Sequence, residues 1–193
     1  MKRSIGVAIA IPPPWRDELQ AWRERFGDPN AAQIVPHITL LPPSIVPDYE
    51  LPEIEEHLRG IAARERPFDI HLRGAGTFRP VSPVVFVGLA TGISDCERLE
   101  LQVRSGPLGE EGRRFPYHPH VTVAHDLPDP ALDAAYDTMA SFDARFSVWG
   151  FSLFEQGEDR HWRPQRDFTF GAGGLPGPLE HKWTGEAPRD RGW

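Results

Sequence analysis

The sequence has a single cysteine and no hydrophobic run long enough to cross a membrane. Cys96 excludes an internal disulfide and a cysteine-based zinc site within one chain. The apolar stretch at residues 5–11 is far shorter than the roughly 20 residues of a membrane-spanning helix. A signal peptide cleaved after Ala10 would have an even shorter apolar region. We therefore expect a cytoplasmic protein with no membrane partner.

Basic residues are also scarce, with 21 Lys and Arg against 28 Asp and Glu and a formal net charge of -7. The chain lacks the overall positive field that drives sequence-independent nucleic-acid binding, so local contacts must hold any polynucleotide substrate. Hydrophobic residues make up 39% of the 193 positions, enough for one core. One globular domain or two closely packed lobes are expected.

The first half of the chain alternates between patterns typical of strands and of amphipathic helices. Pro12-Pro13-Pro14 opens the first helix and Gly27 ends it. A proline-rich turn follows the second strand. The predicted elements are a strand at 4–11, the first helix, a strand at 34–41, a helix at 51–64, and strands at 68–72, with a continuation toward 78, and at 84–90.

The second half repeats this order: a strand with the same short motif, a helix, then two strands. Its predicted elements are a helix at 94–105 capped by Ser94, a strand at 120–124, a helix at 130–142, and strands at 146–156 and 166–170. Glycine, proline and charged residues then dominate. We predict one bilobal domain over residues 1–170 and a flexible tail over 171–193.

The repeated motif is Pro-His-aliphatic-Thr-aliphatic. It occurs as Pro36-His37-Ile38-Thr39-Leu40 and as Pro119-His120-Val121-Thr122-Val123. Side chains alternate along a strand, so each histidine shares a face with its threonine, and the aliphatic residues take the other face. If the halves pack about a pseudo-twofold axis, both His/Thr pairs face one cleft.

Such a cleft suits in-line displacement at phosphorus. One histidine removes a proton from the attacking oxygen, and the other protonates the leaving oxygen. We predict His37 and His120 as this acid and base, with Thr39 and Thr122 as donors to the phosphoryl oxygens. An isolated His-x-Thr triplet is common and usually structural, but duplication in equivalent places favours catalysis. This chemistry requires neither a metal nor a cofactor.

Other residues are weaker candidates. His118 and His125 could join the two histidines around zinc, but ligation would consume the imidazoles, so no metal is predicted. Possible substrate contacts are His125, Tyr117 and Arg114, the last beside Arg113, with Trp162 or Phe168 as further residues for stacking a base. Strict alternation places His125 on the face away from His120.

The duplicated motif resembles that of the two-histidine (2H) phosphoesterase superfamily, which includes 2'-5' RNA ligases and cyclic nucleotide phosphodiesterases. The likeness extends over about residues 4–170. It implies an α+β, bilobal fold in which two antiparallel sheets flank a central cleft, with helices outside. It also implies that His120 activates water while His37 protonates the leaving oxygen.

The implied substrate is RNA or a nucleotide with a 2',3'-cyclic phosphate or a 2'-5' linkage, and we expect a monomer. Many relatives continue the second motif as Leu-Ala-Arg, whereas this chain has Val123-Ala124-His125. This departure leaves the substrate open. The alternatives are a phosphoesterase for a small metabolite such as cyclic ADP-ribose phosphate, and a noncatalytic RNA- or nucleotide-binding module.

Overall fold

The computed structural model describes residues 1–109 and 115–171. Its elements, in chain order, are β1 (Lys2–Ala10), α1 (Trp15–Phe26), β2 (His37–Pro47), α2 (Leu51–Arg64), β3 (Phe68–Thr77), β4 (Val84–Thr91), α3 (Ile93–Val103), β5 (His120–His125), α4 (Asp129–Met139), β6 (Asp143–Val148), β7 (Gly150–Gln156) and β8 (Trp162–Thr169). Short 3-10 turns cover Asp48–Glu50 and Gly106–Leu108.

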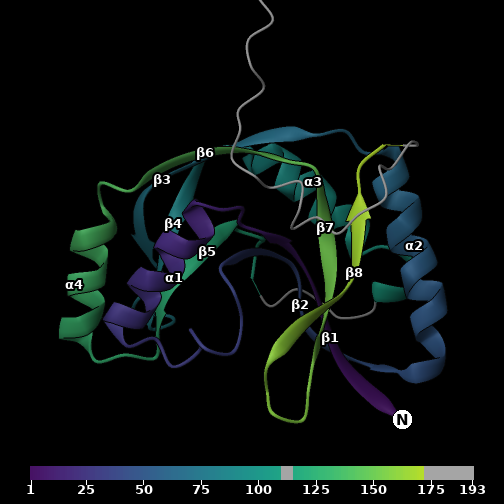
Figure 1. Cartoon of the computed structure of the whole chain (residues 1–193), viewed down its shortest axis with the longest axis horizontal. Coiled ribbons are helices and arrows are strands. Elements are labelled where there is room, and N and C mark those ends of the chain that lie inside the picture. Colours follow the sequence, from purple (N-terminus) through teal and green to yellow (C-terminus); the bar gives the residue numbers. More distant parts are fainter. Residues whose placement is uncertain (110–114, 172–193) are drawn as a thin grey trace, which may run out of the picture.

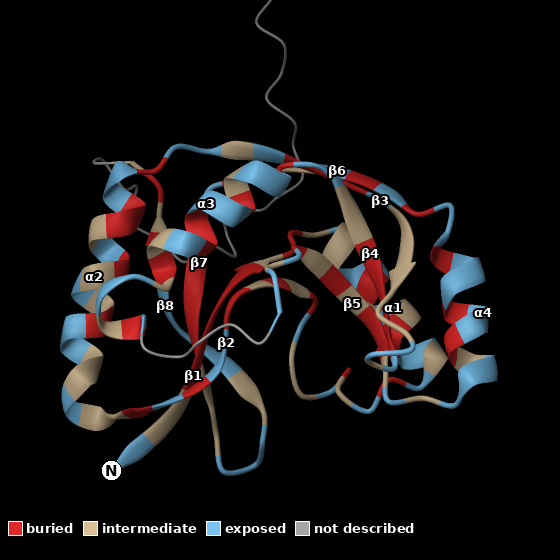
Figure 2. Ribbon diagram, turned by 180° about the vertical axis from the view of Figure 1, so that it is seen from behind, coloured by how far each residue is buried: buried red, intermediate tan, exposed pale blue. Residues whose placement is uncertain are grey.

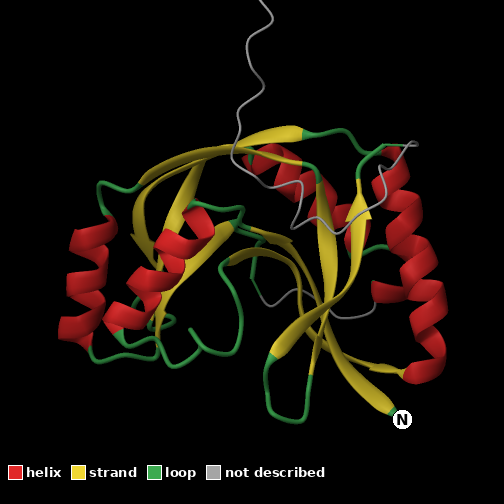
Figure 3. Ribbon diagram, viewed as in Figure 1, coloured by secondary structure: helices red, strands yellow, loops and turns green. Residues whose placement is uncertain are grey.

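The strands form two four-stranded antiparallel sheets (Figure 1). Sheet A has the order β2-β1-β7-β8, and sheet B has the order β5-β4-β3-β6. Helices α2 and α3 lie against sheet A, and α1 and α4 against sheet B, so the helices are on the outside of the molecule (Figure 3). The predicted α+β architecture of two sheets with outer helices is confirmed.

The two halves of the sequence are exchanged between the lobes. Helix α1, from the first half, packs on β5 of sheet B, while α3 packs on β2 of sheet A. Strand β7 comes from the second half and pairs with β1. One continuous core results, with the buried faces of helices and strands turned toward each other (Figure 2).

The helical periodicity is confirmed in detail for α2, whose observed bounds match the prediction. Ile54, Leu58 and Ile61 lie on its buried face. Gly27 ends α1 in the left-handed conformation, with φ of 79°, which glycine adopts without the steric cost of a Cβ atom.

Three predicted details are wrong. Pro42 and Pro43 do not form a turn but continue β2, which is an edge strand and can therefore include residues without an N–H donor. The residue that precedes α3 is Gly92, with φ of 91°, and Ser94 lies inside the helix and caps nothing.

The third error concerns the strand predicted at 146–156, which is two strands in different sheets. β6 pairs with β3 in sheet B, and β7 begins after Trp149 in sheet A. Gly150 lies where the chain passes from sheet B to sheet A. A Cβ atom on this residue would lie 2.3 Å from the carbonyl oxygen of Phe168, so only glycine fits there. A continuous apolar pattern does not reveal a change of sheet.

Residues 172–193, nearly all of the predicted tail, are outside the described residues. Within residues 1–109 and 115–171, no helix combines the length and apolar character needed to traverse a bilayer.

Candidate active site

The two motif strands, β2 and β5, are edge strands of different sheets and lie against each other where the lobes meet. Ile38 and Leu40 lie on the buried face of β2, and Val121 and Val123 lie on the buried face of β5. The histidines and threonines between them are only partly buried. The predicted alternation is therefore confirmed on both strands.

One cavity of about 950 Å³ is lined by both His/Thr pairs. His37 and Thr39 reach it from sheet A, and His120 and Thr122 reach it from sheet B. The structure thus brings the four predicted residues together, and their catalytic roles remain predictions.

The two imidazoles are held in the same way. Nδ1 of His37 lies 2.7 Å from the carbonyl oxygen of Val35, and Nδ1 of His120 lies 2.7 Å from that of His118. Each carbonyl belongs to the residue two positions earlier and accepts a hydrogen bond from an Nδ1–H. This bond selects the tautomer in which Nε2 is the basic nitrogen. Nε2 of neither histidine has a hydrogen-bond partner within the described part of the chain.

Both histidines have lowered pKa values. Burial lowers the pKa of His37 to about 4, assisted by the charges of Arg23 and His120 and opposed by the hydrogen bond to Val35. Burial also lowers the pKa of His120; the hydrogen bond to the His118 carbonyl opposes this effect, and the charge of the His118 side chain adds slightly to it. In the free protein both imidazoles are therefore neutral near pH 7, and a bound phosphate favours protonation because it brings negative charge.

Aromatic rings account for the burial of His120. Phe78 contacts its ring edge-on with centroids 4.9 Å apart, and the Phe86 centroid lies 5.1 Å away. A Cβ atom on Gly76 would lie 2.4 Å from the Phe86 ring, so this glycine makes the room that the ring occupies. The chain thereby encloses the second histidine in an apolar wall.

An ion pair between Arg23 and Asp28 lies beside His37 and was not predicted. Its Nε to Oδ2 distance is 3.0 Å, and both side chains are almost fully buried, with 4% and 0% of their area exposed. Arg23 Nη1 also donates to the carbonyl of Ile34, at 2.6 Å. The pair therefore fixes the segment that leads into β2. Arg23 occupies a position on the apolar face of α1 four residues after Leu19, a weak sign that the side chain is buried.

His125 also lines the cavity, and the alternation argument that placed it on the opposite face is wrong. The pairing of β4 with β5 shifts between Val85 and Phe86, which leaves Val123 as an extra residue. This β-bulge reverses the alternation beyond Thr122. The Nδ2 atom of Asn30 lies 3.0 Å from His125 Nδ1, so the histidine is held at the cavity wall.

The remaining candidates divide into three groups. Tyr117 and Trp162 line the cavity, and the Tyr117 hydroxyl donates to the carbonyl of Thr39, at 2.9 Å. The prediction that Phe168 stacks a base is wrong, because its ring is buried and packs on Phe151 in the core. Arg113 and Arg114 lie outside the described residues.

His118 lines the cavity as well, but its ring packs against Phe78 and Phe86. Among residues 1–109 and 115–171, no group of three or more His, Cys, Asp or Glu side chains is arranged to hold a metal ion.

The lowered histidine pKa values predict the pH dependence of any phosphodiesterase activity. If His37 and His120 act as acid and base, as the sequence predicts, the reaction needs one neutral and one protonated histidine, so activity falls below the pKa of the base and above that of the acid. For the free protein both values lie below 6.5, and we expect kcat/KM to peak below this pH. Bound phosphate raises the histidine pKa values, so kcat should peak at higher pH. Initial rates from pH 4 to 9 test this order, and a kcat/KM maximum above that of kcat would contradict it.

Comparisons with known proteins agree with this geometry. The chain matches the family model of the 2'-5' RNA ligase superfamily over residues 11–160. It is 30% identical over 171 residues to a Bacillus cytotoxicus protein described as a candidate phosphoesterase, covering 88% of this chain and 98% of the relative. A similarly described Geobacillus kaustophilus protein is 29% identical over 168 residues, which cover 86% of this chain and 95% of that relative.

The fold is similar to that of E. coli LigT, which has been solved in complex with 3'-AMP, with NADP+ and with ATP. The 3'-AMP complex superimposes with a TM-score of 0.67 and 20% sequence identity, covering 88% of this chain and 99% of LigT.

Proposed function

The chain belongs to the 2'-5' RNA ligase superfamily of phosphoesterases, and from this we propose that it is a metal-independent phosphoesterase acting on 2',3'-cyclic phosphates or 2'-5' RNA linkages. His37 and His120 supply general acid and base catalysis, and Thr39 and Thr122 bind the phosphoryl oxygens. RNA or a nucleotide is the substrate. A cytoplasmic, monomeric protein remains the expectation drawn from the sequence.

The observation that carries the proposal is the matched pair of imidazoles on one cavity. Each has its Nδ1 engaged by a backbone carbonyl at 2.7 Å, so each Nε2 can exchange a proton with substrate. A binding module has no need for two such nitrogens in equivalent positions. The nucleotide complexes of LigT support a nucleotide as the ligand of this cavity.

In the proposed reaction one imidazole takes a proton from water as its oxygen attacks phosphorus. The other imidazole protonates the leaving oxygen on the opposite side, and the threonine hydroxyls donate to the nonbridging oxygens as charge develops. The family resemblance assigns water activation to His120 and protonation to His37, whereas the pKa of about 4 in the free protein favours a neutral His37, the form that a base needs. The pH dependence of the residual activity of single variants distinguishes these two assignments. Loss of the base removes the fall in rate at low pH, and loss of the acid removes the fall in rate at high pH.

A product assay tests the function. The protein is incubated with 2',3'-cyclic nucleotides, a 2'-5' linked dinucleotide and cyclic ADP-ribose phosphate, and the products are separated by chromatography. Cleavage of either of the first two supports the proposal. Cleavage of only the third would replace it with a metabolite phosphoesterase, and binding without turnover would indicate a noncatalytic module.

The same assay tests the independence from metal. We expect turnover to be unchanged in excess EDTA, because both proton transfers use protein imidazoles. Complete loss of activity, restored by one divalent cation, would instead indicate a metallophosphoesterase.

A further inference from the structure

The tyrosine that precedes the second motif connects the two lobes beside the histidines. Tyr117 lies in the segment that leads into β5 of sheet B, and its hydroxyl donates to the carbonyl of Thr39 on β2 of sheet A, at 2.9 Å. The two residues are 78 positions apart in the chain. Burial raises the pKa of the Tyr117 hydroxyl, so it stays protonated and able to donate over the pH range in which histidines titrate.

Tyr117 is joined to His120 by a short and stiff piece of backbone. His118 follows Tyr117 directly, and its carbonyl accepts the hydrogen bond from His120 Nδ1, at 2.7 Å. Pro119 lies between the two histidines; its ring fixes its own φ and restricts His118 to extended conformations. The place at which Tyr117 is held therefore determines where the carbonyl that orients His120 lies.

Both motif strands have a bulge at the same position of the repeat. The register of β1 with β2 shifts next to Thr39 and leaves Leu40 as an extra residue in β2. Val123 is the extra residue in β5, and it likewise comes directly after the threonine of its motif, Thr122. A bulge interrupts the ladder of backbone hydrogen bonds and bends its strand. Pairing within the sheets thus fixes the motifs less firmly, and contacts from outside each sheet contribute to their placement.

Each motif is attached to the other lobe through the residue three positions before its histidine. Arg23, on the helix α1 that packs against sheet B, donates to the carbonyl of Ile34, at 2.6 Å, just ahead of His37 on sheet A. Tyr117 has the same place ahead of His120 on sheet B and donates to sheet A. The lobes are thus linked on both sides of the cavity, at equivalent positions of the repeat.

We propose that Tyr117 is a positioning residue that sets the separation of His37 and His120. It does so through its hydrogen bond to the backbone of Thr39 and not through contact with the reacting atoms. The inference rests on the proposed function. In-line displacement requires the base and the acid on opposite sides of phosphorus, so a change in their separation slows the reaction even when both imidazoles are present.

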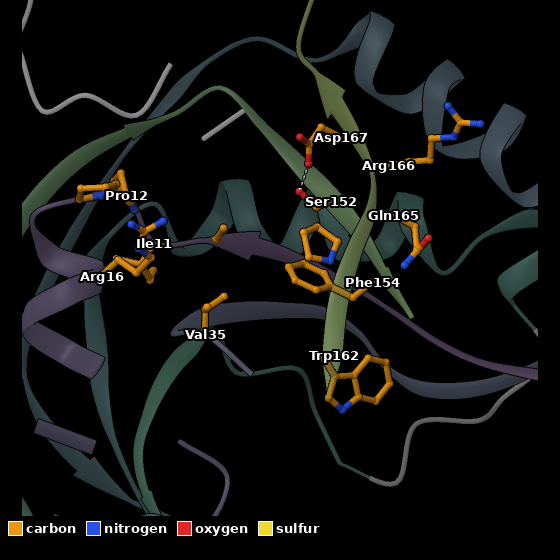
Figure 4. A pocket seen from close by; sticks show the side chains of 13 residues that line it. Ile11, Pro12, Arg16, Val35, Ser152, Phe154, Trp162, Gln165, Arg166 and Asp167 are labelled. Carbon is orange, nitrogen blue, oxygen red and sulfur yellow. Dashed lines mark hydrogen bonds between the residues drawn. The ribbon is translucent and has the colours of Figure 1, made fainter. Parts of the chain in front are cut away.

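The first test is Tyr117→Phe, which deletes the hydroxyl and keeps the ring in the cavity wall. We expect kcat to fall about 10-fold or more because the catalytic groups are misplaced, with KM within about twofold of the native value. Ser152→Ala is the matched control. Ser152 is buried in sheet A, and its Oγ donates to Asp167, at 2.6 Å, in a smaller cavity of about 270 Å³ that neither histidine lines (Figure 4). Its kcat should stay within about twofold of the native value. Equal losses in the two variants, or no loss in Tyr117→Phe, would overturn the proposal.

A double-variant cycle separates positioning from a general loosening of the fold. If the Tyr117 hydroxyl acts by placing His120, its removal has little left to disturb in His120→Ala. We therefore expect kcat of Tyr117→Phe/His120→Ala to lie within about twofold of that of His120→Ala. The same loss from Tyr117→Phe in the native and in the His120→Ala background would contradict the proposal, because the hydroxyl would then act independently of His120.

Binding of orthovanadate tests the positioning role without turnover. Vanadate adopts the five-coordinate geometry of phosphorus under in-line attack, and transition-state analogues bind tightly only where the catalytic groups are correctly placed. In calorimetry, Tyr117→Phe should bind vanadate about 10-fold more weakly than the native protein, and Ser152→Ala should bind it as the native protein does. Equal affinities of Tyr117→Phe and the native protein would refute the positioning role, whereas failure to turn over any assayed substrate would refute the proposed function alone.

Discussion

His37→Ala and His120→Ala should each lower kcat by roughly 10²–10⁴-fold, the range typical of a positioned acid or base. Each imidazole lies on one cavity with its Nδ1 bound to a carbonyl, so each removal deletes one proton-transfer group. The measurement is kcat on the best substrate of the product assay. Circular dichroism should show unchanged folding, because both histidines are only partly buried.

Thr39→Ala and Thr122→Ala provide the comparison. Each removes one hydrogen-bond donor but leaves both imidazoles, so each should cost less activity than either histidine variant. A threonine variant as damaging as the histidine variants would move the main catalytic role to the hydroxyl.

Arg23→Ala should lower the free energy of unfolding by about 3–5 kcal/mol, because it leaves the Asp28 carboxylate buried without its partner. Urea unfolding monitored by tryptophan fluorescence gives the change. Arg163→Ala is the matched control: its partner is Asp159, and both side chains are about half exposed, at 54% and 51%. Arg163→Ala should lower the free energy of unfolding by less than about 1 kcal/mol, because the charges of this pair are exposed to solvent.

A double variant separates the effect of buried charge from the effect of lost contacts. Arg23→Met with Asp28→Asn removes both charges while preserving much of the volume, so it should recover most of the lost stability. An Arg23→Ala protein as stable as the Arg163→Ala protein would show that Asp28 is not held as a buried carboxylate.

The sequence predicted those features that depend on local periodicity. Ile54, Leu58 and Ile61 identified α2, and the two His-x-Thr triplets identified the strands that meet at the cavity. Features that depend on tertiary pairing were missed. The passage from β6 to β7 at Trp149 changes sheets within one apolar pattern.

The same limit applies to the site. A bulge at Val123 brings His125 into the cavity, although simple alternation directs it away. Arg23 and Asp28 are five positions apart, and only the folded structure shows that they form a buried ion pair. The ordinary histidine pKa of about 6.5 would place the pH optimum near neutrality, but burial beside Phe78 and Phe86 lowers the pKa of His120. These effects arise from neighbours that are distant in sequence.

The central claim is that His37 and His120 act together on one phosphate, and the most direct measurement is kcat for His37→Ala/His120→Ala beside the two single variants. Residues that act as a unit are strongly non-additive, so the double variant should be within about threefold of the slower single variant. If the fold-loss of kcat in the double variant equals the product of the losses in the two single variants, the histidines act independently. Near-native turnover in either single variant, with folding intact, would contradict acid and base catalysis by this pair.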